Sequence, residues 1–141
     1  MRGVLVDTHV FLSLALEPER LPLSIRKAVN GAQHRFLSVA SAWEISIKYA
    51  IGKLPLVEPP AAYVPSRSAE LLLQSLPITV RHALRVASLP AFHRDPFDRL
   101  LVAQALEEDL MLLTLDPKIM KYGVQALGAE KARRRRTPRS R

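Results

Sequence analysis

Short apolar runs alternate with amphipathic stretches along this chain, and this alternation favours a parallel β-sheet that helices cover on both faces. The apolar runs predict buried strands at residues 4–6, 36–39, 76–79 and 111–114, and an edge strand at 124–127. Helical periodicity predicts helices through residues 10–15, 23–29, 41–51, 69–73, 80–87 and 96–109, and a short helix from 117 toward 122. The predicted fold class is α/β, with a central parallel sheet of four or five strands.

One segment interrupts this regular pattern. Prolines stand at positions 55, 59, 60 and 65, and proline lacks the backbone N–H that the interior of a helix needs. We therefore expect residues 54–65 to form a linker with room for one short helix.

Composition limits the chemistry that is available. The 141 residues are 48% hydrophobic and 6% aromatic, which suits one domain with an aliphatic core. There is no cysteine, so disulfides, thiolate zinc sites and thiol nucleophiles are excluded, and carboxylates and histidines are the metal ligands that remain. Asp7 interrupts the first apolar run, and no later stretch approaches the roughly 18 apolar residues of a membrane span. We expect a soluble, cytoplasmic protein with no membrane partner.

The positive charge is concentrated at the carboxyl end. The formal net charge is +8, but residues 130–141 hold seven basic residues against one glutamate and so carry +6, which leaves +2 for residues 1–129. An arginine run of this kind buries too little apolar surface to order itself. We expect a folded domain at 1–129 and a disordered basic tail at 130–141, which serves either solubility or RNA binding.

Four carboxylates stand where such a fold would bring them together. Asp7 and Asp116 follow two predicted strands, and Glu44 and Asp98 lie early in two predicted helices. Ligands of open parallel sheets bind beyond the carboxyl ends of the strands. Converging carboxylates repel one another at low dielectric, and a hard cation such as Mg²⁺ or Mn²⁺ relieves that repulsion. The pattern indicates a metal site, and zinc is disfavoured because no histidine cluster exists.

Each acid also has an explanation that needs no metal. Ser41 and Glu44 have the spacing of a capping box, and Glu44 can pair with Lys48 one turn later.

The two Asp-Pro pairs have a similar alternative. Asp95 before Pro96 is a favourable N-cap that places Asp98 in the first helical turn, where the helix dipole favours negative charge. Asp116 before Pro117 repeats this arrangement.

Five sequence blocks, in order along the chain, resemble the PIN-domain family, and within it the VapC-type toxin ribonucleases of type II toxin–antitoxin systems. The resemblance spans residues 3–127. The blocks are Leu5-Val-Asp7-Thr-His9, Ser41-Ala-Trp-Glu44-Ile45 with Lys48, Leu76-Pro-Ile-Thr79, His93-Arg-Asp-Pro-Phe-Asp98-Arg-Leu-Leu-Val-Ala-Gln104-Ala105, and Leu113-Thr114-Leu-Asp116. The resemblance implies a three-layer PIN-like domain and an Mg²⁺- or Mn²⁺-dependent endoribonuclease that cuts single-stranded or loop RNA.

The resemblance also implies the site residues. The family's acidic quartet falls on Asp7, Glu44, Asp98 and Asp116. Thr114 accompanies the last acid, and Asp95 is a supporting residue. Asp7 and Asp98 are our choice for direct metal ligands, while Glu44 and Asp116 either bind a second ion or orient water.

The partners that the resemblance implies are an RNA substrate, a cognate VapB/Phd-like antitoxin and a second copy of the chain in a homodimer. Leu12, Leu16, Leu71 and Leu72 could supply the dimer surface, or they could belong to the core. The basic tail is not part of the family's common pattern.

Several residues near the quartet are candidates for substrate contact. Lys48, Arg94 and Arg99 lie within a turn of an acid, so they could bind phosphate or form ordinary salt bridges. His9 and His93 are weaker candidates for a part in the reaction.

Trp43 and Phe97 could stack on bases, although their neighbours favour packing in the core. Two other classes of function remain open. One is a non-catalytic RNA- or partner-binding module on the same fold. The other is a phosphoacceptor receiver domain, which the missing acidic pair after the first strand disfavours.

Overall fold

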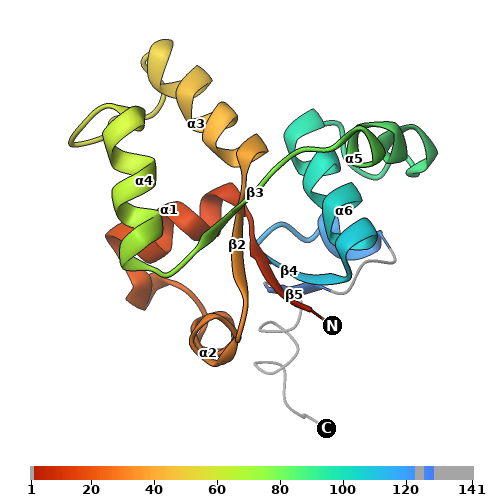
Figure 1. Ribbon diagram of the computed structural model, residues 1–141, viewed down its shortest axis with the longest axis horizontal. Helices are drawn as coiled ribbons and strands as arrows, with labels where there is room; N and C mark the ends of the chain where they lie inside the picture. The colour runs from red at the N-terminus through yellow and green to blue at the C-terminus, as the bar shows by residue number, and fades with distance from the viewer. Residues whose placement is uncertain (1, 123–125, 129–141) are drawn as a thin grey trace, which may run out of the picture.

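The computed structural model describes residues 2–122 and 126–128. Its centre is a five-stranded, fully parallel sheet with the strand order β3-β2-β1-β4-β5, which confirms the predicted fold class (Figure 1). The strands are β1 (Gly3–Val6), β2 (Arg35–Ser38), β3 (Gln74–Leu76), β4 (Leu110–Thr114) and β5 (Ala126–Gly128).

Helices connect the strands and cover the two faces of the sheet. The α-helices are α1 (Thr8–Leu16), α2 (Leu23–Gly31), α3 (Val39–Ala50), α4 (Pro60–Glu70), α5 (Val80–Arg85) and α6 (Pro96–Glu108). Short 3-10 helices are η1 (Pro18–Arg20), η2 (Val86–Ser88) and η3 (Ile119–Lys121). In Figure 1, α1, α2 and α4 lie on one side of the strands, and α5 and α6 lie on the other.

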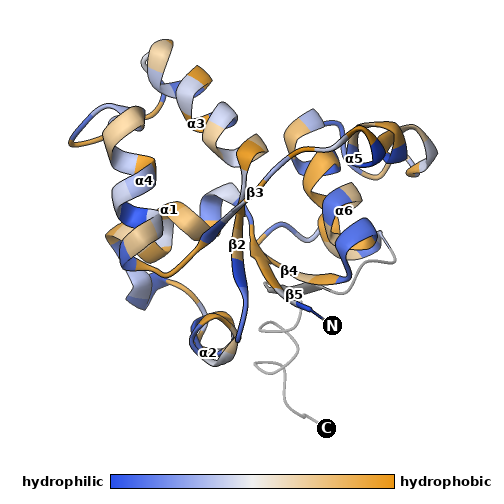
Figure 2. Ribbon diagram, in the orientation of Figure 1, coloured by the Kyte–Doolittle hydropathy of each residue, from blue (hydrophilic) through white to orange (hydrophobic). Residues whose placement is uncertain are grey.

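Two apolar clusters form the core, one on each face of the sheet. Successive residues of a strand point to opposite faces, so Val4 and Val6 join the cluster that packs under α1, α2 and α4, and Leu5 joins the cluster under α6. Figure 2 shows the resulting apolar character of β1 and β4. A strand that is buried on both faces reads as a continuous apolar run, which is why both strands were predictable from sequence.

The strand order places a crevice beside the end of β1. The chain moves outward from β1 to β2 and β3, and then crosses back to add β4 and β5 on the other side of β1. This reversal is a topological switch point, where open parallel sheets bind ligands. Val6 pairs with Leu113 in the parallel register, so Asp7 and the residues after β4 emerge together at this edge.

The expected capping box at Ser41 is wrong, because α3 begins earlier. Ser38 is the N-cap, and its hydroxyl accepts the N–H of Ala40 at 2.9 Å. Val39, which we predicted as the last strand residue, is therefore helical. Ser41 lies inside the helix, buried, and its hydroxyl oxygen accepts a hydrogen bond from Thr8 Oγ1 at 2.9 Å. Glu44 is free of any capping role.

The linker predicted at 54–65 is shorter than expected, because α4 continues through Pro65 to Glu70. Pro65 and Ala61, whose carbonyl loses its helical partner, are both exposed, so water can satisfy that carbonyl. Tyr63 on the opposite face is buried and contacts Phe11 edge-on at 6.5 Å between ring centroids. Its burial holds the helix in spite of the proline.

The third strand also lies earlier than predicted, at Gln74–Leu76 instead of 76–79. Pro77 has no N–H for the ladder, and Thr79 is the N-cap of α5. Residues 124 and 125 of the predicted edge strand and the tail at 130–141 lie outside the described residues. No helix among the described residues is both long enough and apolar enough to cross a membrane.

Candidate active site

A cleft of about 480 Å³ opens at the carboxyl edge of the sheet, and all four predicted acids line it. Asp7 and Asp116 reach it from the ends of β1 and β4, and Glu44 and Asp98 reach it from α3 and α6. Other lining side chains include Asp95, His9, Lys48 and Lys53. Segments separated by up to about a hundred residues of sequence thus deliver their carboxylates to one cavity.

Asp7 is the most enclosed carboxylate of the group. Its Oδ1 accepts the N–H of Val10 at 2.8 Å as the N-cap of α1. Burial raises the pKa of Asp7 above its ordinary value, and nearby Glu44 raises it further, while a hydrogen bond with the Thr114 hydroxyl acts in the opposite direction. The fold therefore holds the Asp7 carboxylate where hydrogen bonds do not fully offset the cost of burying its charge.

Glu44 has an orphaned oxygen. The residue is only 5% exposed, and Oε2 accepts a hydrogen bond from Lys48 Nζ at 2.7 Å. Oε1 is buried and has no hydrogen-bond partner among the described residues. Buried polar atoms almost always have a partner, so this oxygen marks a position where an additional group, such as a cation, fits.

Asp98 lies in the first turn of α6, as the Asp95-Pro96 pair predicted. Asp95 is the N-cap, and its Oδ1 accepts the N–H groups of Phe97 at 2.8 Å and Asp98 at 3.4 Å. Burial raises the pKa of Asp98 to about 7, and the charges of Asp95 and Asp7 contribute to that rise. N-capping of α6 explains why an aspartate stands at position 95. It does not explain why Asp98 is buried among other acids.

Asp116 sits in a turn after β4. Its Oδ1 accepts the N–H of Lys118 at 2.9 Å, and its own N–H donates to Thr114 Oγ1 at 3.0 Å. Thr114 therefore contacts two members of the quartet, Asp7 and Asp116. The remaining oxygen of Asp116 lies 2.7 Å from Nε2 of His93.

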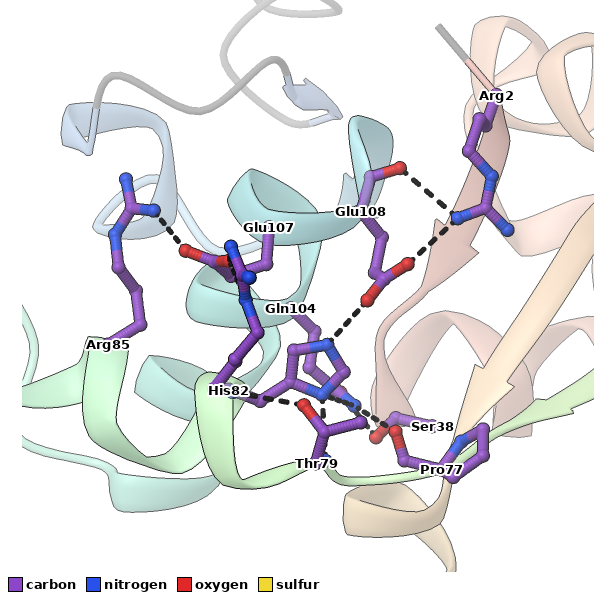
Figure 3. Close-up of polar contacts among 10 residues, drawn as sticks. Arg2, Ser38, Pro77, Thr79, His82, Arg85, Gln104, Glu107 and Glu108 are labelled. Carbon is purple, nitrogen blue, oxygen red and sulfur yellow. Dashed lines mark hydrogen bonds and ion pairs between the residues drawn. The ribbon is translucent and has the colours of Figure 1, made fainter.

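The positions of α3 and α6, which carry Glu44 and Asp98, are linked by a buried amide. Ser38 Oγ donates to Gln104 Oε1 at 2.5 Å, and Gln104 Nε2 donates to the Pro77 carbonyl at 3.2 Å (Figure 3). Both Ser38 and Gln104 are buried. This bond joins the start of α3 directly to the middle of α6.

The residues of the cleft fit a hard divalent cation. Such ions prefer several carboxylate oxygens, and the cleft offers acids whose charges repel and one buried oxygen with no partner. His93, Asp98 and Asp116 also present ligand atoms within 4.8 Å of one another. The carboxylates alone are suited to bind the ion, since His93 Nδ1 accepts the N–H of Asp95 and a neutral ring then carries its proton on Nε2.

Cationic side chains near the acids differ from the prediction. Lys48 and Lys53 line the cleft, whereas Arg94 and Arg99 are not among the described lining residues. The guanidinium of Arg99 donates to backbone carbonyls, including that of Pro90 at 2.9 Å, which argues against its assignment to phosphate.

Sequence reasoning missed Lys53. The signal that could have found it is Gly52, whose positive φ of 75° ends α3 and turns the chain. The N–H of Lys53 donates to the Lys48 carbonyl at 2.9 Å, so the chain turns back at the end of α3, and both lysines line the cleft.

The interpretation of Trp43 as a core residue is wrong. Trp43 is 57% exposed, and it packs edge-on against the half-buried Phe97, with 5.2 Å between ring centroids. The leucines considered for a dimer surface divide into two pairs. Leu16 and Leu72 are exposed, and Leu12 and Leu71 pack against the core.

Comparison with known proteins places the chain in a family. A PIN domain family model matches residues 4–124. Ribonuclease VapC16 of Mycobacterium tuberculosis (strain ATCC 25618 / H37Rv) is 53% identical over 84 residues, which cover 54% of this chain and 57% of that protein. Ribonuclease VapC22 of the same organism is 27% identical over 123 residues, or 86% of this chain and 93% of that protein.

Solved structures have the same fold. The crystal structure of VapBC2 from Rickettsia felis bound to a DNA fragment from their promoter matches with a TM-score of 0.66 at 12% identity, over 89% of this chain and 97% of that one. The alignment with VapC16 spans just over half of that relative, but the family model covers most of this chain. The fold, the acidic cleft and these matches agree, and the chain belongs to the PIN domain family.

Proposed function

We propose that this chain is the toxin of a toxin–antitoxin pair, a metal-dependent endoribonuclease that hydrolyses RNA phosphodiester bonds. The observation that carries the proposal is the convergence of Asp7, Glu44, Asp98 and Asp116 on one cleft. The two relatives named above as ribonucleases support the reaction class. A non-catalytic binding module would have no need to keep four mutually repelling acids together.

We assign the metal as Mg²⁺ or Mn²⁺, because these ions prefer carboxylate and water oxygens. Asp7 and Asp98 would hold the ion directly, and Glu44 and Asp116 would hold a second ion or orient water. A bound divalent ion supplies a Lewis acid that activates water and neutralises charge on the phosphate. Thr114 keeps Asp7 and Asp116 oriented through its hydroxyl.

The substrate would lie along the open cleft, with its phosphates against Lys48 and Lys53. Lys48 also pairs with Glu44, and that hydrogen bond raises the pKa of Lys48, so the ammonium stays charged beside the acids. Lys53 is exposed and lines the same cleft. Two adjacent cations beside a carboxylate cluster suit a polyanion whose reacting phosphate meets the metal.

We propose that the partners are a VapB/Phd-like antitoxin and a second copy of the chain. Structural neighbours described as VapBC or toxin–antitoxin complexes support the antitoxin. Leu16 and Leu72, which are 73% and 68% exposed, are available for contact between copies. We expect the protein to act in the cytoplasm, where RNA is present.

RNA cleavage by the purified chain tests this function. Wild-type protein should cut RNA with Mg²⁺ or Mn²⁺ and stop when a chelator is added. Asp7→Asn and Asp98→Asn should each lose cleavage while keeping the circular dichroism spectrum of the wild type. Metal-independent cleavage, or full activity in either variant, contradicts the assignment. Sequencing the RNA ends left after brief expression would then identify the substrate.

A further inference from the structure

His93 is held at three points, although it stands outside the acidic quartet. Its Nδ1 accepts the N–H of Asp95 at 3.1 Å. Its Nε2 lies 2.7 Å from Asp116 Oδ2 and 3.1 Å from Asp98 Oδ2. One ring nitrogen thus faces two carboxylates that come from different elements, the start of α6 and the turn after β4.

The contact at Nδ1 determines where a neutral ring carries its proton. A backbone N–H is always a donor, so Nδ1 must act as the acceptor for Asp95. The single ring proton of neutral His93 then sits on Nε2, so the ring donates to Asp116, and Nε2 also lies 3.1 Å from Asp98 Oδ2. With its lone pair turned to the backbone, His93 is suited to orient the acids and not to bind a metal.

The backbone of His93 is also anchored. Its N–H donates to the Tyr122 hydroxyl at 2.9 Å, and Tyr122 is buried. Arg99 Nη1 donates to the same hydroxyl at 3.2 Å and to the Pro90 carbonyl at 2.9 Å. The loop before α6 is therefore tied down on both sides of the histidine. Because these contacts fix the orientation of the imidazole, its Nε2–H points in one defined direction.

His93 contacts the two acids from behind the cleft. Asp98 and Asp116 are among the residues that line the cavity, and His93, which is 11% exposed, is not. Each contact uses only one oxygen, Oδ2, of its carboxylate. The ring therefore leaves Oδ1 of Asp98 open to an ion, while Oδ1 of Asp116 accepts the N–H of Lys118.

We propose that His93 is a positioning residue whose one Nε2–H donates to Asp116 and faces Asp98, and so holds the two carboxylates assembled for a divalent ion. The inference rests on the proposed function, since it concerns the same metal site. Without the donor, the two like charges would separate, and the ion would have to bring them together again. Groups that orient metal ligands in this way change metal affinity by about 10- to 100-fold.

Mn²⁺ binding by the full-length protein tests the proposal without any measurement of activity. Electron paramagnetic resonance of free Mn²⁺ gives the Kd for the wild type, His93→Phe and His93→Gln. Phenylalanine keeps a ring but no donor, whereas the glutamine amide can accept from Asp95 and donate to the acids. We expect the Kd of His93→Phe to rise about 10- to 100-fold, and that of His93→Gln to stay near the wild-type value.

Mn²⁺ binding by Asp98→Asn distinguishes failure of the proposed metal site from failure of the proposed role of His93. If Asp98→Asn binds Mn²⁺ as the wild type does, the proposed metal site is wrong, and the inference falls with it. If Asp98→Asn loses Mn²⁺ but His93→Phe binds as tightly as the wild type or more tightly, only the inference is overturned. Equal losses in His93→Phe and His93→Gln also overturn it, because the donor would then be irrelevant.

Thermal unfolding without metal establishes that each variant is folded. Should His93→Phe fail to fold, Tyr122→Phe decides the question, since it removes the hydroxyl that accepts the His93 N–H and leaves the ring in place. A weaker Mn²⁺ affinity in Tyr122→Phe supports the proposal, and an unchanged affinity overturns it.

Discussion

The raised pKa of Asp98 predicts that the metal-free protein becomes more stable when this acid is neutralised by Asp98→Asn. Burial and the neighbouring acids raise its folded-state pKa from 3.8 to about 7. Because the folded-state pKa is the higher one, the folded protein keeps its proton between about pH 4 and pH 7 while the unfolded chain releases it. Wild-type stability should therefore fall as pH rises through this window, and it should level off above it.

The size of the stability change follows from the difference between the folded-state and unfolded-state pKa of Asp98. One pKa unit corresponds to about 1.4 kcal/mol, so ionised Asp98 costs the fold about 4 kcal/mol above pH 7. Asparagine avoids this cost, because the pKa difference already contains every interaction of the ionised carboxyl with the fold. We expect Asp98→Asn to exceed the wild type by about 4 kcal/mol at pH 8, and the difference to vanish near pH 4.

Urea unfolding in the presence of a chelator, followed by circular dichroism at several pH values, measures this difference. Glu107→Gln is the matched control of opposite sign, because hydrogen bonds from Arg85 and Arg81 lower the pKa of Glu107. That variant should be less stable than the wild type at pH 8, with the difference lost as pH falls below the ordinary glutamate pKa. Parallel stability curves for Asp98→Asn and the wild type would refute the reasoning.

Three further predictions concern Lys53 at the cleft, the basic tail at 130–141, and Glu108 at the end of α6. Lys53→Met should weaken RNA binding and lower its salt dependence by about one phosphate contact, as measured by fluorescence anisotropy; an unchanged salt slope would remove Lys53 from the substrate path. Truncation after Ala129 should leave the melting temperature and RNA cleavage unchanged and weaken RNA binding at low salt, whereas equal binding would assign the tail to solubility. Glu108→Gln should lower stability at neutral pH, because hydrogen bonds from His82 and Arg2 lower the pKa of Glu108 (Figure 3); the loss should disappear as pH falls below the ordinary glutamate pKa, and a loss that persists at acid pH would contradict this account.

Local rules were sufficient for the parts of the site that depend on neighbours in sequence. Asp95-Pro96 marks the start of α6 because the cap and the proline act within one turn. Asp7 follows a strand whose apolar run is continuous, since both its faces are buried. Parallel strands end at the same edge, so the convergence of strand-end acids followed from topology.

Features that depend on distant contacts were not predictable in this way. Ser38 and Ser41 are equally good N-caps by type, and the choice between them involves partners far along the chain, Gln104 and Thr8. Arg99 looked like a phosphate ligand because it lies beside Asp98, but its donors are occupied by a loop that folds back over α6. The spacing of hydrophobic residues along the chain does not indicate such long-range contacts.

The role of His93 also depends on a contact between residues far apart in sequence, so the sequence alone did not reveal it. In sequence His93 is one histidine before an Asp-Pro pair, and the sequence does not show which carboxylate its ring faces. The tautomer follows from the Asp95 N–H, and the role follows from Asp116, which lies 23 positions away.

The most direct test of the central claim is a crystal structure of the protein grown with Mn²⁺, in which anomalous scattering locates the ion. We predict a peak in the cleft within about 2.5 Å of carboxylate oxygens of Asp7 and Asp98, with Glu44 and Asp116 facing it. A cleft without a peak at saturating Mn²⁺, or an ion bound only elsewhere on the molecule, would contradict the account.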